Sequence, residues 1–325
     1  MELKEILSNL EDKLNFRTFR NEFGLDFQFE GEKLIVRGDW DCSLLEQYEI
    51  LDKALSDKYE WEFHTSNMKS DIEWKPNVKV FNPHLDRTFH GTLSSSNNDY
   101  NLLTELEIDM LKNRDKDLVF SCYNRAPRPH RVRIVDEILN RNLEKHGLIS
   151  FCCTEEERPA GWKDIVTYVQ SLGISQKTLE YFSNCPHELD LKINEEEDFQ
   201  CIRFDIEDIE KTFFTIVTEA FFYEKDSLLV SEKTFRFLPF HPMIIVGQPH
   251  TLKHLKDIGF KTFPKMFDES YDDIIDNDER LKFIMDEVER LCKLPQENLK
   301  QKYIESFDSI KHNTNFLKER YAINN

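Results

Sequence analysis

The chain has 325 residues, of which 39% are hydrophobic and 12% aromatic, so it can bury a large core and is not globally disordered. Its 62 acidic residues outnumber 43 basic ones, and the formal net charge of −19 disfavours a protein that coats nucleic acid or lies on an anionic membrane surface. The length favours two domains. With only 9 glycines, the chain has few places for a glycine-rich phosphate loop.

The first third of the chain predicts helices and a small sheet. The apolar spacing indicates helices over residues 1–20, 44–55 and 102–111. Alternating apolar residues on either side of the turn at Glu30–Glu32 predict an antiparallel pair of strands. Two further short strands are predicted at Tyr59–His64 and Val78–Phe81.

A strand, an irregular loop and a helix are predicted next. The apolar run Asp117–Tyr123 indicates a buried strand, and the loop at 124–130 contains two prolines. Helical periodicity begins at Arg131, and Gly147 is predicted to end that helix. This order is typical of an α/β domain.

The rest of the chain repeats this alternation. The predicted strands are Phe213–Val217, Met243–Val246 and Lys261–Phe263. Four helices are predicted. The first begins near Ser231, and the second runs over Thr251–Ile258 and stops at Gly259. The third begins with a cap at Asn277, and the fourth runs over 296–321. We therefore expect an α/β fold with a mostly parallel sheet. The expected domains are residues 1–115 and 116–325.

Basic residues gather directly after the strand predicted at 117–123. Four arginines fall within nine positions: Arg125, Arg128, Arg131 and Arg133. Ligands of open α/β sheets bind at the carboxyl ends of strands, and the Arg fork matches phosphate oxygens. We expect a phosphate or diphosphate there, with Arg125 and Arg128 nearest the strand end. The alternative is a solvated basic turn whose arginines pair with surface carboxylates.

A second candidate site combines Glu219, at the end of a predicted strand, with the segment Ser231–Thr234. A carboxylate can accept both ribose hydroxyls, and an ammonium group can meet a diphosphate. The alternative is that Glu232 only caps a helix and that Lys233 is a surface side chain.

Three stretches resemble a known family: Phe213–Glu219, Val230–Phe235 and Pro242–Gly247. Together they are similar to the donor-binding region of two-domain, GT-B-type glycosyltransferases, most of all to fucosyltransferases and exostosin-like enzymes. In those families a strand-end Glu precedes a Thr-Glu-Lys-like motif, a helix and an apolar strand leading to Gly. Ser231 stands where the families usually carry Thr. The stretch 259–272 also resembles glycosyltransferase-like proteins of phages and large viruses.

The resemblance implies two Rossmann-like domains with a cleft between them and a C-terminal helix. It implies that Glu232 binds the ribose of a nucleotide-diphosphate sugar, that Lys233 binds its diphosphate, and that Glu219 and Thr234 belong to the same pocket. Arg125 would neutralise the leaving nucleoside diphosphate. Enzymes of this kind generally need no metal and no further cofactor.

A general base that activates the acceptor hydroxyl is expected on the first domain, across the cleft. The candidates are Asp39, Asp41, His84 and His90. Asp39-Trp40-Asp41 also has the spelling of a metal-binding Asp-x-Asp motif, so a metal site, an acceptor-side base and a polar turn are alternatives there.

The expected function is thus transfer of a sugar to a hydroxyl of a glycan or other small acceptor. The alternatives are a non-catalytic nucleotide- or phosphate-binding module and a phage-type DNA-base glycosyltransferase, whose acceptor the net charge disfavours. The absence of a targeting segment and of long apolar runs favours a cytoplasmic protein without a membrane span. The seven cysteines form no CxxC pair, which favours reduced thiols.

Overall fold

A computed structural model of the chain describes four strands between residues 26 and 81 by their backbone, and residues 105–151, 163–184, 210–224 and 228–320 in more detail. The chain divides into two compact units. One comprises Met1–Asp99 with Tyr223–Glu232, and the other comprises Tyr100–Phe222 with Lys233–Asn325. Each is described by itself below.

The first unit contains a four-stranded sheet in the order β1-β2-β3-β4. Strands β1 (Asp26–Glu30) and β2 (Lys33–Arg37) pair antiparallel, as the alternation around their turn predicts. Strands β3 (Glu60–His64) and β4 (Val78–Phe81) continue the sheet in parallel and confirm the two short strands predicted there. The helices predicted at 1–20 and 44–55 lie outside the described residues.

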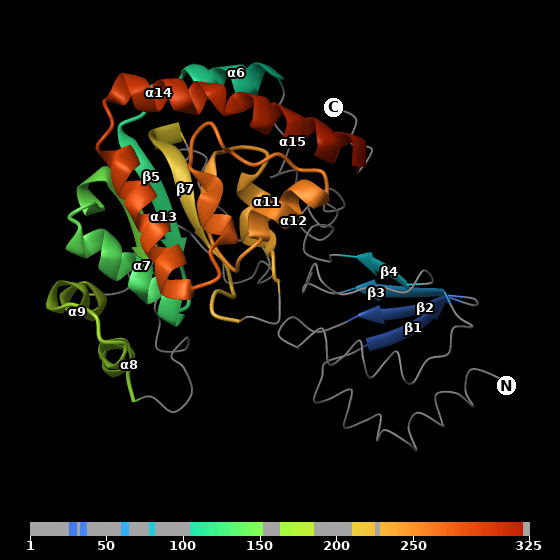
Figure 1. Ribbon diagram of the computed structural model, residues 1–325, viewed down its shortest axis with the longest axis horizontal. Coiled ribbons are helices and arrows are strands. Elements are labelled where there is room, and N and C mark those ends of the chain that lie inside the picture. The colour runs from blue at the N-terminus through green and yellow to red at the C-terminus, as the bar shows by residue number, and fades with distance from the viewer. Residues whose placement is uncertain are drawn as a thin grey trace. The chain divides into compact units, whose positions relative to one another are not determined.

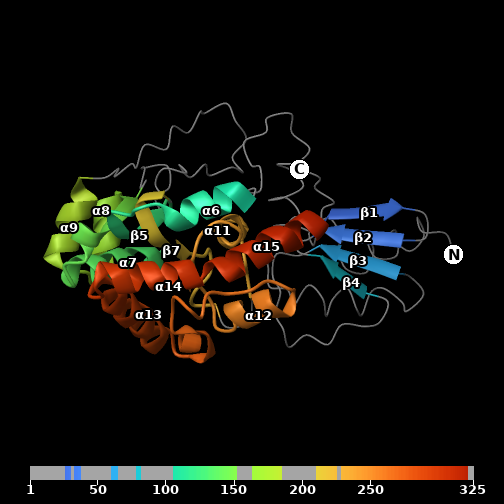
Figure 2. The ribbon, with the colours of Figure 1, turned by 90° about the horizontal axis from the view of Figure 1, so that it is seen from above.

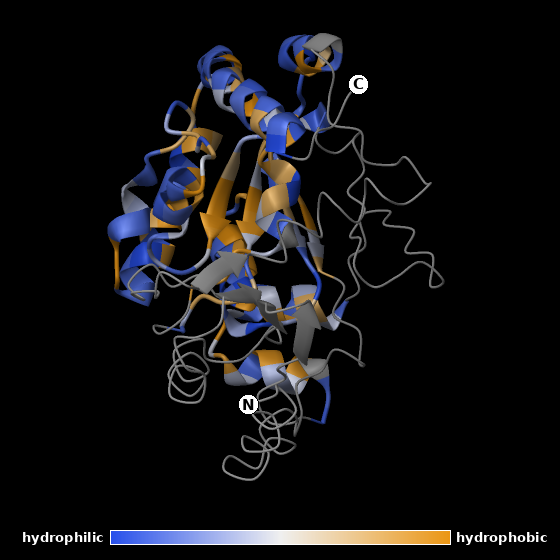
Figure 3. Cartoon of the chain, turned by 90° about the vertical axis from the view of Figure 1, so that its right-hand side faces the viewer, coloured by the Kyte–Doolittle hydropathy of each residue, from blue (hydrophilic) through white to orange (hydrophobic). Residues whose placement is uncertain are grey.

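The second unit is built on a parallel sheet in the order β6-β5-β7-β8. Its strands are β5 (Leu118–Asn124), β6 (Gly147–Phe151), β7 (Thr212–Thr218) and β8 (Met243–Val246). All residues of β7 and β8 are buried, which fits a sequence of apolar residues and threonines without a charged side chain. Figure 3 shows the hydrophobic residues gathered along this sheet and the hydrophilic ones on the outer faces of the helices.

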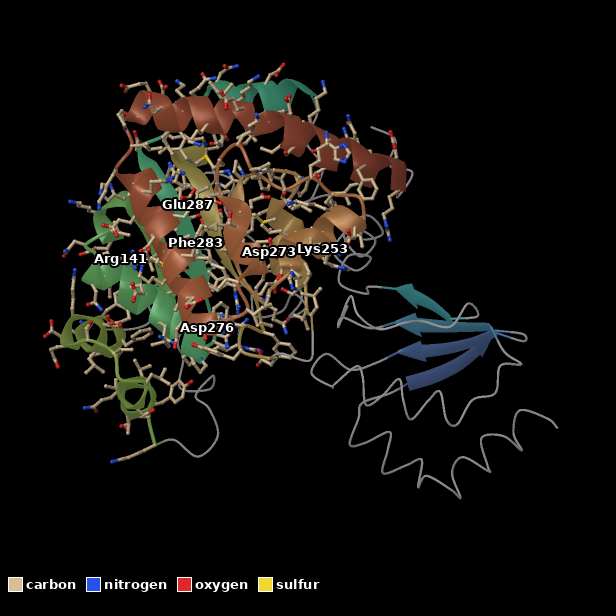
Figure 4. The ribbon with its side chains drawn as sticks, viewed as in Figure 1. Arg141, Lys253, Asp273, Asp276, Phe283 and Glu287 are labelled. Atoms are coloured by element: carbon tan, nitrogen blue, oxygen red, sulfur yellow. The ribbon has the colours of Figure 1, made fainter. Side chains whose placement is uncertain are left out.

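Helices lie on both faces of this sheet (Figures 1 and 2). Helix α7 (Pro129–Asn140) and helix α13 (Asn277–Cys292) share one face, whereas the short helix α11 (Glu232–Phe237) lies on the other. Arg141, just after α7, bonds Asp286 and Glu289 of α13 at 2.7 and 2.9 Å, so the two helices are joined at their outer side (Figure 4). The remaining elements are α6 (Glu105–Asn113), η2 (Glu144–His146), α8 (Ile165–Ser171), α9 (Gln176–Ser183), α12 (Thr251–Asp257) and η4 (Glu269–Asp273).

The last helices cover the amino edge of the sheet (Figure 1). The single helix predicted at 296–321 is wrong, because the structure divides it at Ser306 into α14 (Gln296–Glu305) and α15 (Phe307–Arg320). The Ser306 hydroxyl donates to the carbonyl of Lys302, a local bond that competes with the helical ladder. Tyr303 of α14 packs edge-on against Phe213 of β7 with ring centroids 5.7 Å apart.

The predicted end of the helix after β5 is also wrong. Helix α7 ends at Asn140 rather than at Gly147, because Asn142 adopts a positive φ of 56° and the Leu143 amide bonds the carbonyl of Ile138. This is a Schellman ending with Asn in the place that Gly usually takes. Gly147 instead begins β6, where an added Cβ would lie 2.4 Å from the ring of Phe120.

The segment Lys261–Phe263, predicted as a strand, is not one. Side chains occupy the backbone groups that a neighbouring strand would bind. Asn313 bonds both the amide and the carbonyl of Lys261, and Glu269 accepts from the amide of Phe263. The cap predicted at Asn277 is likewise one position late, because the Asp276 carboxylate accepts from the first amides of α13.

Candidate functional site

The carboxyl ends of β5 and β7 form the topological switch point of the second unit. From β5 the chain passes through α7 to β6 on one side, and it later returns to β7 on the other side of β5. Ligands of open α/β sheets bind beyond the strand ends where the direction reverses in this way. The basic loop and Glu219, which the sequence singles out, follow these two strands.

A buried hydrogen bond links the two strand ends. The hydroxyl of Thr218 donates to Oδ1 of Asn124 over 2.8 Å, and Nδ2 of Asn124 lies 3.3 Å from Sγ of Cys122. Burial raises the pKa of Cys122 to about 12, so this thiol stays protonated and unreactive at neutral pH. Among the described residues, the free cysteines Cys122 and Cys292 are both buried, in line with the reduced thiols that the sequence favours.

The half-buried side chain of Arg128 crosses from the loop after β5 to the loop after β7. It donates to the carbonyl of Ala220 over 2.6 Å, and its guanidinium carbon lies 6.0 Å from the ring centroid of Phe221. Arg125, three residues earlier, is half-buried too. The two arginines predicted to meet a phosphate thus lie at the switch point.

His130 and Arg131 are buried at the start of α7 and bind backbone carbonyls. Nε2 of His130 bonds the carbonyl of Glu219 at 2.8 Å, and Arg131 lies 3.4 Å from the carbonyls of both Thr218 and Glu219. Burial, together with Arg131 and Arg128, lowers the pKa of His130 to about 3. His130 is therefore neutral, and its Nε2 carries the proton that the carbonyl accepts.

Arg133 behaves as the alternative prediction expects, in which the arginines of the basic cluster pair with surface carboxylates. It pairs with the exposed carboxylate of Asp278 at 2.6 Å. The four clustered arginines thus divide into surface pairing at Arg133, carbonyl binding at Arg128 and Arg131, and a half-buried position at Arg125.

Glu219 has a fully buried side chain. Its Oε1 accepts from the hydroxyl of Thr234 at 2.5 Å, and its Oε2 accepts from the amide of Ala220 at 3.2 Å. The amide of Glu219 donates to the carbonyl of Val246, which extends the pairing of β7 with β8 by one residue. The structure thus brings together two of the residues predicted to share a pocket, Glu219 and Thr234.

Helix α11 carries the rest of the second predicted motif. Glu232 is its first residue, and its side chain lies outside what the structure describes. Lys233 follows and is half-buried, whereas Thr234 is fully buried. The motif therefore has an inward part, Thr234, and a part nearer the surface, Lys233.

The start of α12, which follows β8, is occupied by a side chain of the protein itself. The two oxygens of Asp272 accept from the amides of Leu252 and Lys253 at 2.9 Å each. Burial raises the pKa of Asp272, although these two bonds act in the opposite direction. An external anion would have to displace this carboxylate, so the ends of β5 and β7 are the better candidate site.

Sequence reasoning missed Arg280 of α13, which also reaches the carboxyl edge. It is 1% exposed and is the first of the largest buried side chains. A signal was present, because Arg280 lies four residues before Ile284 and eight before Val288, both on the buried stripe of α13. A cation on an apolar stripe must find acceptors inside the protein.

Asp39, Asp41, His84 and His90, the predicted candidates for a base, lie outside the described residues. Among residues that the structure does describe, no three His, Cys, Asp or Glu side chains gather as metal ligands would. Within the same residues, no helix combines the length and apolar character of a membrane span. Comparisons with protein-family models, with curated proteins and with solved structures found no match.

Proposed function

We propose that this protein is a glycosyltransferase that takes a sugar from a nucleotide-diphosphate donor bound at the carboxyl ends of β5 and β7. The observation that carries the proposal is the position of the basic loop Arg125–Arg128 at the switch point of a parallel sheet. The buried pair of Glu219 and Thr234 supports it, because it fixes the end of β7 beside that loop.

The proposed chemistry needs fixed positive charge. Departure of a nucleoside diphosphate concentrates negative charge on the leaving oxygen, and cations held in place stabilise that transition state more than the ground state. Arg125, Arg128 and Lys233 would supply this charge, with Glu232 on the ribose. Asp39, Asp41 or His90 would take the proton of the acceptor hydroxyl. The proposed architecture is a GT-B pair of Rossmann-like domains, and the mechanism requires no metal.

Binding of nucleoside diphosphates tests the donor site. A diphosphate present at about 100 times its dissociation constant adds about 2.7 kcal/mol to the free energy of unfolding, a readily measured thermal shift. We expect UDP, GDP or ADP to stabilise the wild type and Arg133→Ala equally, because Arg133 pairs with Asp278 on the surface. Arg125→Ala and Lys233→Ala should lose most of the shift. An equal loss of the thermal shift in Arg133→Ala would show that the diphosphate responds to positive charge in general and not to a specific site.

A non-catalytic nucleotide-binding module is the second candidate. The observation in its favour is that Arg128, His130 and Arg131 already bind carbonyls of residues 218–220, so part of the basic cluster serves the fold. Product analysis with a panel of sugar nucleotides separates the two. Release or transfer of the sugar by the wild type, with loss of this activity in Lys233→Ala, supports the enzyme. Binding without consumption of any donor supports the module. Duplex DNA in the acceptor panel tests the phage-type alternative.

A further inference from the structure

The guanidinium of Arg280 has five N–H groups, and all five have an acceptor. Nε donates to the carbonyl of Gly247 at 3.2 Å. One terminal nitrogen donates to the carbonyls of Ile274 and Ile275 at 2.8 and 3.2 Å. The other donates to the carbonyl of Phe222 at 3.0 Å and to Oδ1 of Asn277 at 2.7 Å. One side chain thus joins the loop after β7, the loop after β8 and the turn before α13.

The ring of Phe222 strengthens this junction. It lies 4.5 Å from the guanidinium carbon of Arg280, and it stacks on the ring of His130 with centroids 5.6 Å apart and an interplanar angle of 21°. Phe222 is 1% exposed. The ring is therefore enclosed between a residue of α7 and a residue of α13, so both helices on this face of the sheet fix the loop after β7.

Four carbonyls, one at the end of β7 and three in the loop after it, accept bonds from these two helices or from Arg128, the N-cap residue of α7. The carbonyl of residue 218 binds Arg131, that of residue 219 binds His130 and Arg131, and that of residue 220 binds Arg128. The carbonyl of Phe222 binds Arg280. A loop with its carbonyls bound in this way is held in one conformation before any ligand arrives. Such preorganisation favours binding and catalysis, because no ordering cost arises when the ligand enters.

We infer that Arg280 is a positioning residue, which holds the loops after β7 and β8 as a single rigid edge of the proposed donor site. Its role for the ligand rests on the proposed function, whereas the coupling of the two loops does not. Lysine cannot replace it, because an ammonium group has three donors and no planar fork for five acceptors.

Hydrogen exchange in Arg280→Lys tests the coupling. Two amides report on the two loops: that of Ala220, which donates to Glu219, and that of His250, which donates to the carbonyl of Asp272. We expect peptides covering both amides to exchange at least about tenfold faster, with unchanged exchange in β5 and α14. Arg290→Lys is the matched control, since Arg290 lies on the same helix and pairs with Glu287.

The inference is overturned if Arg280→Lys leaves either loop as protected as in the wild type, or loosens only the turn at 274–277. Should this variant not fold, Asn277→Ala removes one of the five acceptors and should speed exchange in the same two loops, by about threefold. Titration with UDP, GDP and ADP is the second arm, in which Arg280→Lys should bind at least about tenfold more weakly than Arg290→Lys. If the wild type binds none of them, the proposed function fails, and the exchange result still decides the role of Arg280.

Discussion

The hydroxyl of Thr234 donates a 2.5 Å hydrogen bond to the carboxylate of Glu219, and both side chains are fully buried. This bond joins helix α11 to the end of β7. Since a buried carboxylate that loses a donor keeps its desolvation cost, we expect Thr234→Val to lower the free energy of unfolding by about 1–3 kcal/mol. Thr234→Ser keeps the hydroxyl, loses only the methyl group and should lose much less stability. Urea unfolding measures both variants, and a larger loss in Thr234→Ser than in Thr234→Val would show that the methyl group, not the hydrogen bond, matters.

Lys116 predicts a pH dependence of stability. It is 2% exposed, and its ammonium lies 4.5 Å from the ring centroid of Tyr303 and 3.1 Å from the carbonyl of Glu210. Burial lowers its pKa from 10.5 to about 7, with Glu210 opposing and Arg114 assisting the shift. Between these two values the unfolded chain binds more protons at this lysine than the folded chain does. Its contribution to the free energy of unfolding therefore rises with pH, by about 1.4 kcal/mol per unit.

Lys116→Met isolates that contribution. Urea unfolding between pH 6.5 and 9.5 should show wild type gaining stability relative to Lys116→Met above pH 7, and no such change below it. Lys300→Met is the control, because Lys300 pairs with exposed Asp115. A difference between wild type and Lys116→Met that stays constant across this range would contradict the shifted pKa.

Adding a methyl group at Gly147 and at Gly173 should lower the free energy of unfolding for two different reasons. At Gly147 an added Cβ would lie within 2.7 Å of three atoms of the Phe120 ring, so Gly147→Ala should cost about 1–3 kcal/mol through overpacking. At Gly173 nothing lies within 4 Å, but φ is +70°, so Gly173→Ala should cost about 1–2 kcal/mol through the backbone. Phe120→Leu should partly relieve the first cost and leave the second unchanged, which a double-mutant cycle measures.

Asp136 of α7 binds the amino-terminal end of helix α9. Its Oδ1 accepts from the amide and hydroxyl of Ser175 and from the hydroxyl of Thr178, at 3.0, 2.8 and 2.7 Å. We expect Asp136→Ala to cost about 2–3 kcal/mol and to speed hydrogen exchange in α9 while β7 stays protected. Asp164→Ala removes only the local cap of α8 and should leave α9 unchanged. Equal effects of the two variants on α9 would contradict this role of Asp136.

The strands of the second unit were largely predictable because their apolar runs are short and bounded by polar residues. Strands β5, β7 and β8 lie within one residue of their predicted ends. The sequence does not predict strand β6, because a glycine at position 147 after a helical pattern indicates a helix end. That helix ends instead at Asn140, and the residue with positive φ that follows its cap is Asn142, which is a weaker sequence signal than glycine. The apolar residues of Lys261–Phe263 resemble a strand, but long-range bonds from Asn313 and Glu269 decide its conformation.

The candidate site was only partly predictable. Order along the chain suffices to place the basic loop and Glu219 at strand ends, because parallel strands share one carboxyl edge. The order along the chain does not reveal that Arg131 binds carbonyls inside the protein. Nor does it reveal that Arg133, two positions later on the same helix, pairs with Asp278 at the surface. Arg280 also binds the loop after β7, but it lies 149 positions beyond Arg131 in the chain, so no local sequence pattern could connect the two arginines.

The position of β5 between β6 and β7 has a consequence for synthesis on the ribosome. Strand β5 can pair with β6 once the chain has emerged as far as Phe151, but its partner on the other side comes much later, since Thr215 lies 94 positions after Ser121. Until then the other side of β5 is an open strand edge, which is a hazard for association between nascent chains. A fragment that stops before Thr212 keeps this edge open permanently, and self-association of that fragment is the expected result.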